Sequence, residues 1–140
     1  MKHGAGFLRF AYLFGATFDG LMLIPMASPA VGARMLGMAD FHPGPDYRYA
    51  MGVAAALMAG WTALLVWGAF DPVARRGVLL LTAAPVVAGL IAAGVYAVAN
   101  GLVALSAMTP IFAFQISAVA LFVAGYRVAC RLSASAKTTV

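Results

Sequence analysis

Apolar residues fall into four long runs along the chain, separated by shorter polar segments. The runs cover approximately residues 7–27, 47–70, 77–99 and 108–130. An α-helix needs about 20 mostly apolar residues to cross the hydrocarbon core of a bilayer, and each run meets that length. The pattern therefore predicts an all-α integral membrane protein, a bundle of four transmembrane helices that forms a single membrane domain over residues 1–140.

The polar segments between the runs differ in length and character. Residues 28–46 form the longest one; its first part, to residue 38, is apolar with one arginine and is expected to lie as a short interfacial helix. The rest contains two prolines and a glycine, which are typical of turns. Residues 71–76 predict a tight turn, and residues 131–140 predict a flexible tail. Pro25 and Pro85 should interrupt their helices, because proline removes a backbone donor.

The composition supports this interpretation. Of the 140 residues, 64% are hydrophobic and 9% are charged, with a mean hydropathy of +0.97. A soluble domain has about 25% charged residues. Many alanines and glycines, with more arginine than lysine, are typical of a GC-rich bacterial genome, so we expect a multi-pass protein of the bacterial inner membrane.

The basic residues predict the orientation of the four spans. With the N-terminus inside the cell, the only lysine or arginine residues assigned to the outer side are Arg34 and Arg48. Cytoplasmic segments are enriched in arginine and lysine. We therefore expect both termini, the turn 71–76 and the tail in the cytoplasm, since these regions hold the other basic residues: Lys2, Arg9, Arg75, Arg76, Arg127, Arg131 and Lys137.

The first span has an alternative interpretation as a cleaved signal peptide, because a basic start followed by an apolar run also describes one. Its run is long for a signal peptide, and an acid, Asp19, interrupts it. We therefore expect the first helix to be retained. The other three spans would keep the same orientation in either case.

Stripes of small residues predict how the helices pack, because such residues let membrane helices approach closely. The second span carries Gly52, Ala56 and Gly60, and the third carries Gly89, Ala93 and Ala97. In the first span, Ala11 and Gly15 lie on the same stripe as Asp19. This spacing predicts that the carboxyl group faces neighbouring helices.

Asp19 is the main candidate for function. An acid within a span is costly unless it is protonated, paired or hydrated, and such residues mark functional sites more often than not. A purely structural role, locking the helix register, is the competing hypothesis. We expect a polar pocket in the outward half of the bundle, with Arg48 or Arg34 as the ionic partner of Asp19. The candidate ligand-binding or ion-pair residues are Asp19, Arg34, Arg48, Tyr96, Asn100 and Gln115.

Several classes of chemistry lack support in the sequence. The single cysteine, Cys130, excludes an internal disulfide or a cysteine-only metal site. The two histidines, His3 and His42, lack metal-ligand spacing. We therefore expect no catalytic residue, metal or cofactor, and no binding to nucleic acid. Membrane lipids are the expected partners, together with further copies of the chain or a larger membrane complex.

Three functions remain open. The best supported is binding of a lipid, a small hydrophobic ligand or a membrane partner around Asp19. The second is a proton- or cation-coupled small transporter or channel component that titrates Asp19. A lipid-modifying membrane enzyme is the least supported, because no second acid lies within the spans. The layout resembles small bacterial inner-membrane proteins, DoxX-like proteins among them; the resemblance is one of architecture and implies no residue roles.

Overall fold

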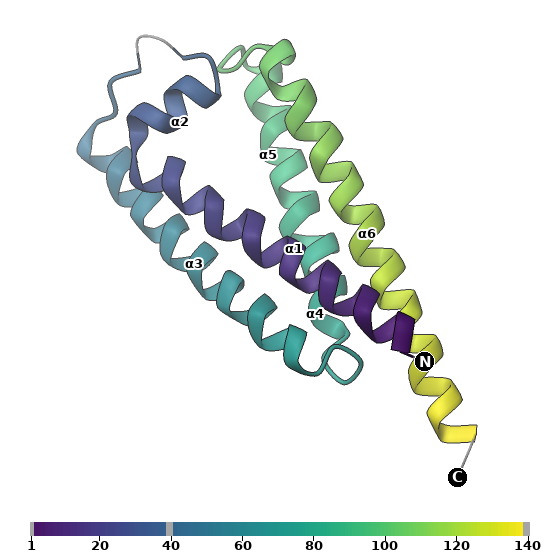
Figure 1. Ribbon diagram of the computed structural model, residues 1–140. Helices are drawn as coiled ribbons and strands as arrows, with labels where there is room; N and C mark the ends of the chain where they lie inside the picture. Colours follow the sequence, from purple (N-terminus) through teal and green to yellow (C-terminus); the bar gives the residue numbers. More distant parts are fainter. Residues whose placement is uncertain (1, 39–40, 139–140) are drawn as a thin grey trace.

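The computed structural model describes residues 2–38 and 41–138, and within these ranges the chain is helical with no strand (Figure 1). The helices are α1 (Lys2–Ala27), α2 (Pro29–Met35), α3 (Pro45–Phe70), α4 (Gly77–Leu81), the π-helical turn η1 (Thr82–Val87), α5 (Ala88–Ala99) and α6 (Leu105–Thr138). Four segments are long and apolar enough to cross a membrane: Gly4–Ala27, Pro45–Phe70, Gly77–Ala99 and Leu105–Ser135. The prediction of four such helices is confirmed.

The helix ends differ from the predicted ones mainly in the last helix. Residues 131–138, expected as part of a flexible tail, continue α6 as far as Thr138. No glycine or proline follows Gly125 in the sequence, and alanine, arginine and lysine are good helix formers. The helix therefore has no reason to stop at the apolar boundary.

The segment after α1 contains the short helix that its sequence predicts. Ser28 interrupts the helix after Pro25, and α2 starts at Pro29, in the first turn, where a missing backbone donor costs nothing. Gly37 ends α2 with a positive φ of 70°, and the Met38 N–H bonds back to the Ala33 carbonyl. This is the glycine-terminated helix end of a Schellman type.

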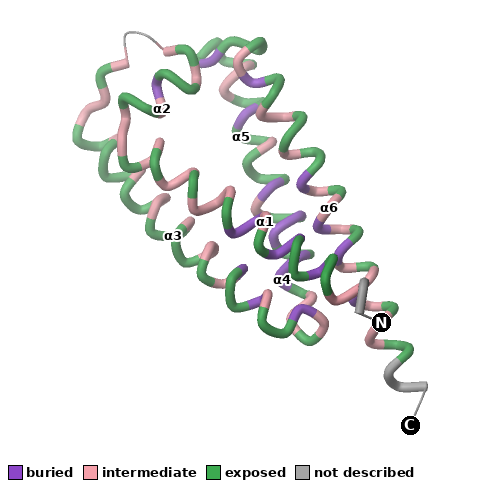
Figure 2. The backbone as a smooth tube through the Cα atoms, in the orientation of Figure 1, coloured by how far each residue is buried: buried purple, intermediate pink, exposed green. Residues whose placement is uncertain are grey.

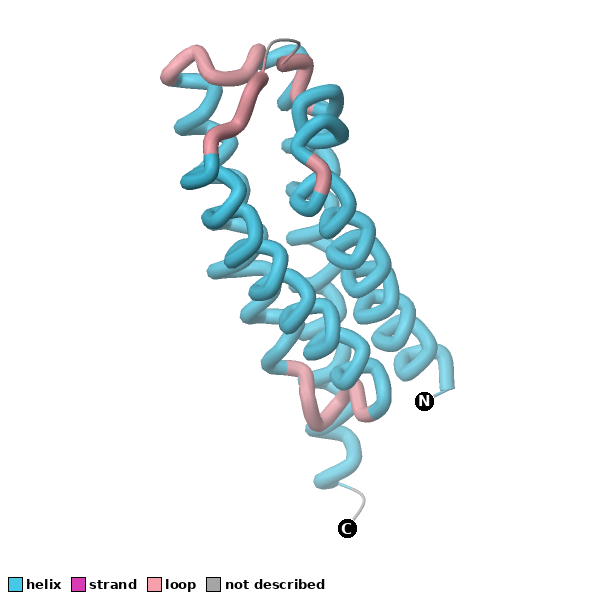
Figure 3. Tube along the Cα trace, turned by 90° about the vertical axis from the view of Figure 1, so that its left-hand side faces the viewer, coloured by secondary structure: helices cyan, strands magenta, loops and turns pink. Residues whose placement is uncertain are grey.

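The four long helices run antiparallel to their neighbours in sequence, so α1 begins and α6 ends at the same end of the bundle (Figures 1 and 3). Helix α1 packs along α3 and against α6, while α4, η1 and α5 pack on α6. The buried positions gather mainly in the half of the bundle near the termini (Figure 2). Fully buried side chains there include Leu8, Tyr12, Leu65 and Leu79.

Tyr12 joins α1 to the turn between the second and third spans. Its ring is fully buried over Gly68 of α3, in space that a side chain at Gly68 would occupy. Its hydroxyl donates a hydrogen bond of 2.7 Å to the Arg75 carbonyl oxygen. The Arg75 guanidinium lies 3.7 Å from the centre of the Trp67 ring and donates to the Trp67 carbonyl oxygen. These contacts fix the turn 71–76 against the bundle.

Pro85 does not break the third span but changes its winding. It lies within η1, where the backbone adopts one wider turn before α5 resumes. Such π-helical turns accommodate one extra residue in a helix. The sequence correctly placed an interruption at Pro85, and the structure shows its form.

The extra residue explains why the packing stripe predicted on the third span, Gly89, Ala93 and Ala97, is wrong. Regular winding from the buried Leu79 would bring Ala93 and Ala97 to the inner face. After η1 the inner face is shifted by one residue, so that Gly94 is buried and Ala93 is exposed. A Cβ at Gly94 would lie 2.7 Å from both Met108 and Phe112 of α6.

The stripe predicted on the second span is also wrong, for a different reason. Gly52, Ala56 and Gly60 are all exposed, and nothing lies within 4 Å of a Cβ built at either glycine. Close approach of α3 to α1 uses Gly68 instead. Only the stripe on the first span faces the interior as predicted, since Ala11 and Gly15 are buried.

Candidate functional site

Asp19 lies on the face of α1 that is packed between α3 and α6. One turn earlier on that face, a Cβ at Gly15 would lie 2.9 Å from Phe122 of α6 and 3.2 Å from Leu65 of α3. Residues four apart share a helix face. The acid is therefore carried into the bundle by the same stripe that brings the three helices together.

The antiparallel packing places Gln115 of α6 near the depth of Asp19. The ring centres of Phe18 and Phe114, the residues that precede these two, are 4.6 Å apart. On the other side, a Cβ at Gly20 would lie 3.8 Å from the Thr62 methyl group of α3. The two polar side chains thus lie within about one helical turn of each other in depth, on neighbouring helices.

Both side chains contain a buried oxygen atom without a hydrogen-bond partner. Within residues 2–38 and 41–138, these atoms are Oδ2 of Asp19 and Oε1 of Gln115. Both residues are half-buried overall, so each presents one part of its polar group to the interior. A buried polar atom that lacks its hydrogen bond costs about 1–3 kcal/mol. The described part of the protein therefore contains two unsatisfied acceptors on neighbouring helices.

Aromatic rings border this polar pair. Phe14 and Phe18 of α1 have ring centres 4.7 Å apart, and Phe114 of α6 packs against both. Phe114 is 37% exposed, so the cluster reaches the surface. The rings provide an apolar wall beside the two acceptors.

The helices diverge toward the end that carries α2. Helix α3 packs mainly on α1, whereas α5 packs on α6 and η1. The ribbons of the pair α1 and α3 separate from those of α5 and α6 in this half (Figure 1). Exposed apolar side chains occur here on several helices, including Leu21, Ile24 and Val95. Asp19 and Gln115 lie where the compact half gives way to the looser half.

The structure does not bring the predicted ionic partners to Asp19. Arg48 is exposed in the first turn of α3, about 21 Å along the helix axis from Thr62. Arg34 is exposed in the last turn of α2. Across the described residues, no ion pair to Asp19 is present and its Oδ2 has no donor.

The two candidates at the end of the third span are exposed, unlike the acid. Tyr96 is 66% exposed. Asn100 caps α5, where its side-chain amide donates to the Tyr96 carbonyl oxygen at 2.9 Å. Of the six candidate residues, Asp19 and Gln115 are the two that are partly buried, and the other four are exposed.

A further polar contact was not predicted from the sequence. The Trp61 indole N–H donates to the Thr82 hydroxyl oxygen at 3.1 Å, and this hydroxyl donates to the Val78 carbonyl oxygen. Thr82 is only 2% exposed. Trp61 lies next to Thr62 and so near the depth of Asp19. The sequence contained one signal, a hydroxyl three residues before Pro85 within an apolar span.

The part of the chain that the structure describes contains no candidate metal site. No group of three or more histidine, cysteine, aspartate or glutamate side chains comes together there.

The sequence matches no protein-family model, and comparisons with curated proteins and with solved structures give no match. The likeness to DoxX-like proteins stays one of layout alone, and the function must be argued from this chain's own geometry.

Proposed function

We propose that the chain is a multi-pass protein of the bacterial inner membrane with both termini in the cytoplasm. Four helices of sufficient length and hydropathy support the multi-pass character. The described basic residues support the orientation, because five arginines lie toward the end with the termini and two toward the other end. The five are Arg9, Arg75, Arg76, Arg127 and Arg131.

Cysteine labelling tests this orientation. In a Cys130→Ser background, a cysteine at Ser28 or Asn100 should react with a membrane-impermeant maleimide added to intact cells. A cysteine at Ala74, which is exposed in the turn 71–76, should react only after the membrane is opened. The reverse pattern would place the termini outside the cytoplasm.

We further propose that the protein binds a lipid or a small hydrophobic molecule between α1 and α6. The observation that supports this most strongly is the pair of buried, unsatisfied oxygen atoms of Asp19 and Gln115. Both atoms are acceptors, so the matching ligand group is a donor such as a hydroxyl or an ammonium group. The rings of Phe14, Phe18 and Phe114 suit an apolar body attached to that group.

Binding of matched probes tests this proposal. Farnesol offers an apolar body and one O–H donor, whereas its methyl ether lacks the donor. The wild type should bind the alcohol about 10-fold more tightly, since a buried acceptor that lacks its hydrogen bond costs about 1–3 kcal/mol. Asp19→Leu and Gln115→Leu should remove this preference, and mass spectrometry of the purified proteins would identify any natural ligand that is lost with it.

Asp46→Asn serves as the control, because Asp46 is an exposed acid in the first turn of α3. This variant should retain the wild-type preference. Equal binding of alcohol and ether by the wild type, with no co-purified molecule, would refute the proposal.

The second candidate is a proton- or cation-coupled transporter or channel component. The absence of a described partner for the Asp19 carboxylate oxygen favours it, since unpaired acids within spans can bind protons or cations. A transporter needs more than four short helices, and further copies of the chain would supply them. Gly52 and Gly60 leave room on the exposed face of α3 for another helix. A lipid-modifying enzyme would need a second catalytic group, and we do not propose it.

A further inference from the structure

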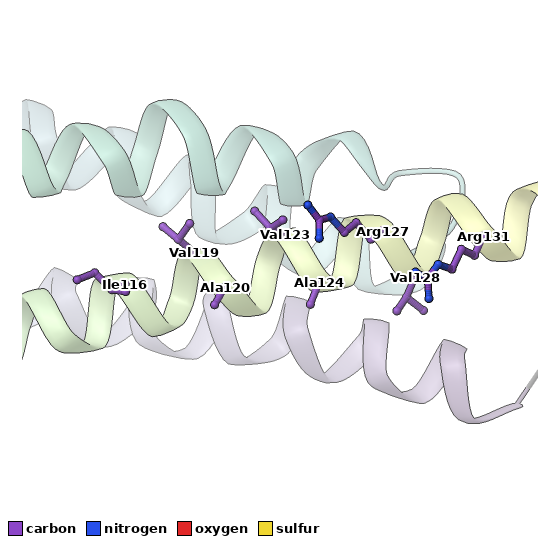
Figure 4. A pocket seen from close by; sticks show the side chains of 8 residues that line it. All are labelled: Ile116, Val119, Ala120, Val123, Ala124, Arg127, Val128 and Arg131. Carbon is purple, nitrogen blue, oxygen red and sulfur yellow. The ribbon is translucent and has the colours of Figure 1, made fainter.

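A second feature extends from Ile116 toward the end with the termini, along the outer face of α6. An open groove of about 620 Å³ runs along this helix. Figure 4 shows that all the side chains lining it come from α6 and that two arginines lie at one end. The lining residues are Ile116, Val119, Ala120, Val123, Ala124, Arg127, Val128 and Arg131.

The shape of the groove follows from the sequence. Small side chains at Ala120 and Ala124 form one row, between the larger Ile116 and Val128. Val119 and Val123 form a neighbouring row, which continues into the two arginines. Residues four apart are stacked along a helix face, so the alanines leave a hollow beside a ridge of valines. The groove is apolar for its whole length up to Arg127.

The two arginines have no neutralising partner among the residues that the structure describes. No hydrogen bond or ion pair of either guanidinium group is present there, whereas Arg75 and Arg76 each donate to a backbone carbonyl oxygen. The acid nearest to this end in the fold, Asp71, accepts a hydrogen bond from the Ala74 N–H. Both Arg127 and Arg131 are exposed, one helical turn apart on one row. Side chains at this spacing lie about 5–6 Å apart, which lets both reach one phosphate group.

The length of the apolar part matches one leaflet of a membrane. Ile116 and Arg127 are separated by about 16 Å along the helix axis, and half of the hydrocarbon core is about 15 Å thick. The arginines then lie at the headgroup level, where guanidinium groups bind phosphate through paired N–H donors. The apolar rows lie at the level of the acyl chains.

We propose that this groove is a binding site for an anionic phospholipid in the leaflet around the end with the termini. The phosphate group contacts Arg127 and Arg131, and an acyl chain lies over Ala120 and Ala124. Charge complementarity distinguishes this occupant from a zwitterionic lipid, whose headgroup carries a compensating cation. The site is separate from Asp19, so its existence does not depend on the proposed function.

Competition between lipids tests the site. The protein is reconstituted in nanodiscs of equal amounts of phosphatidylglycerol and phosphatidylcholine with identical acyl chains, and native mass spectrometry counts the retained lipids. Each basic residue near an anionic surface contributes about a factor of five in affinity. The wild type should therefore retain phosphatidylglycerol with about 30-fold preference, and Arg127→Gln/Arg131→Gln should lose most of it.

Two further variants make the result specific. Arg34→Gln/Arg48→Gln removes the same charge from exposed positions at the other end and should keep the preference. Ala120→Leu/Ala124→Leu fills the hollow without a change in charge and should also weaken retention. Inorganic phosphate in excess should not displace the lipid, because it lacks the acyl chains.

Three outcomes would overturn the proposal. The first is a preference that persists in the Arg127→Gln/Arg131→Gln variant, and the second is a preference that falls equally in the Arg34→Gln/Arg48→Gln variant. Alternatively, the wild type retains no lipid and its mass shows a second copy of the chain, which the Ala120/Ala124 variant releases; the groove would then be a helix-packing face.

Discussion

Replacing Asp19 by leucine should stabilise the protein once any bound ligand has been removed. The Asp19 Oδ2 is buried without a described partner, and such a group costs about 1–3 kcal/mol in the folded state. Leucine removes this cost and keeps an apolar side chain on the inward face of α1. The free energy of unfolding, measured by SDS titration in mixed micelles with tryptophan fluorescence, should rise by about that amount.

The same measurement separates a ligand site from a structural lock. Removal of one member of a buried ion pair destabilises a protein by about 3–5 kcal/mol. A loss of that size in the Asp19→Leu variant would show that the carboxyl group has a structural partner in solution. Asp46→Asn, at the exposed start of α3, should change the stability by less than about 1 kcal/mol.

Replacing Gly68 by alanine should destabilise the bundle by about 1–3 kcal/mol. The added methyl group would overlap the ring of Tyr12, which is fully buried and held by its hydrogen bond to the Arg75 carbonyl oxygen. Overpacking of a well-packed interior typically costs this much. The ring cannot move without also disturbing the turn 71–76, so thermal unfolding in detergent should begin at a lower temperature.

Gly60→Ala provides a matched control in the same helix. Nothing lies within 4 Å of a Cβ at Gly60, so the change should be neutral or stabilising by up to about 1 kcal/mol, as glycine-to-alanine changes in helices are. The double variant Gly68→Ala/Tyr12→Ala should be less unstable than the sum of its two single changes. Equal effects of Gly60→Ala and Gly68→Ala, or strict additivity in the double variant, would contradict this account.

The sequence predicts the helices of this fold well, because their signal is local. Twenty-residue apolar runs, and the prolines and glycines between them, identify four spans and the short helix α2. Helix contacts depend on geometry that local signals do not contain. Gly52, Ala56 and Gly60 have the same spacing as a packing stripe, yet they face outward, while Gly68 contacts Tyr12.

The candidate site was predicted in part. Asp19 and Gln115 are both partly buried and each has an unpartnered oxygen atom, but that they form one site stays a prediction. The sequence favours Arg48 as a partner because it starts the adjacent span in the outward half. In the structure, however, Arg48 lies near the start of α3, about 21 Å along the helix axis from Thr62, which is near the depth of Asp19. The contact between Trp61 and Thr82 depends on how α3 meets η1, and no sequence spacing expresses that relation.

The π-helical turn at Thr82–Val87 determines which positions of the third span should tolerate mutation, because the core-facing positions follow a different helical phase on each side of it. Before Pro85, positions in phase with Leu79 and Ala83 face the core; beyond it the phase advances by one residue, to Val87 and Gly94. The wider turn thus offsets the core-facing positions of the two segments by one residue. A one-residue deletion in this turn would restore regular α-helical winding and leave the core faces of both segments in place, because Gly94 would then occupy the position that regular winding from Leu79 brings inward. Among related chains, a one-residue difference in the length of this span should therefore occur at the turn, where it leaves both core faces in place.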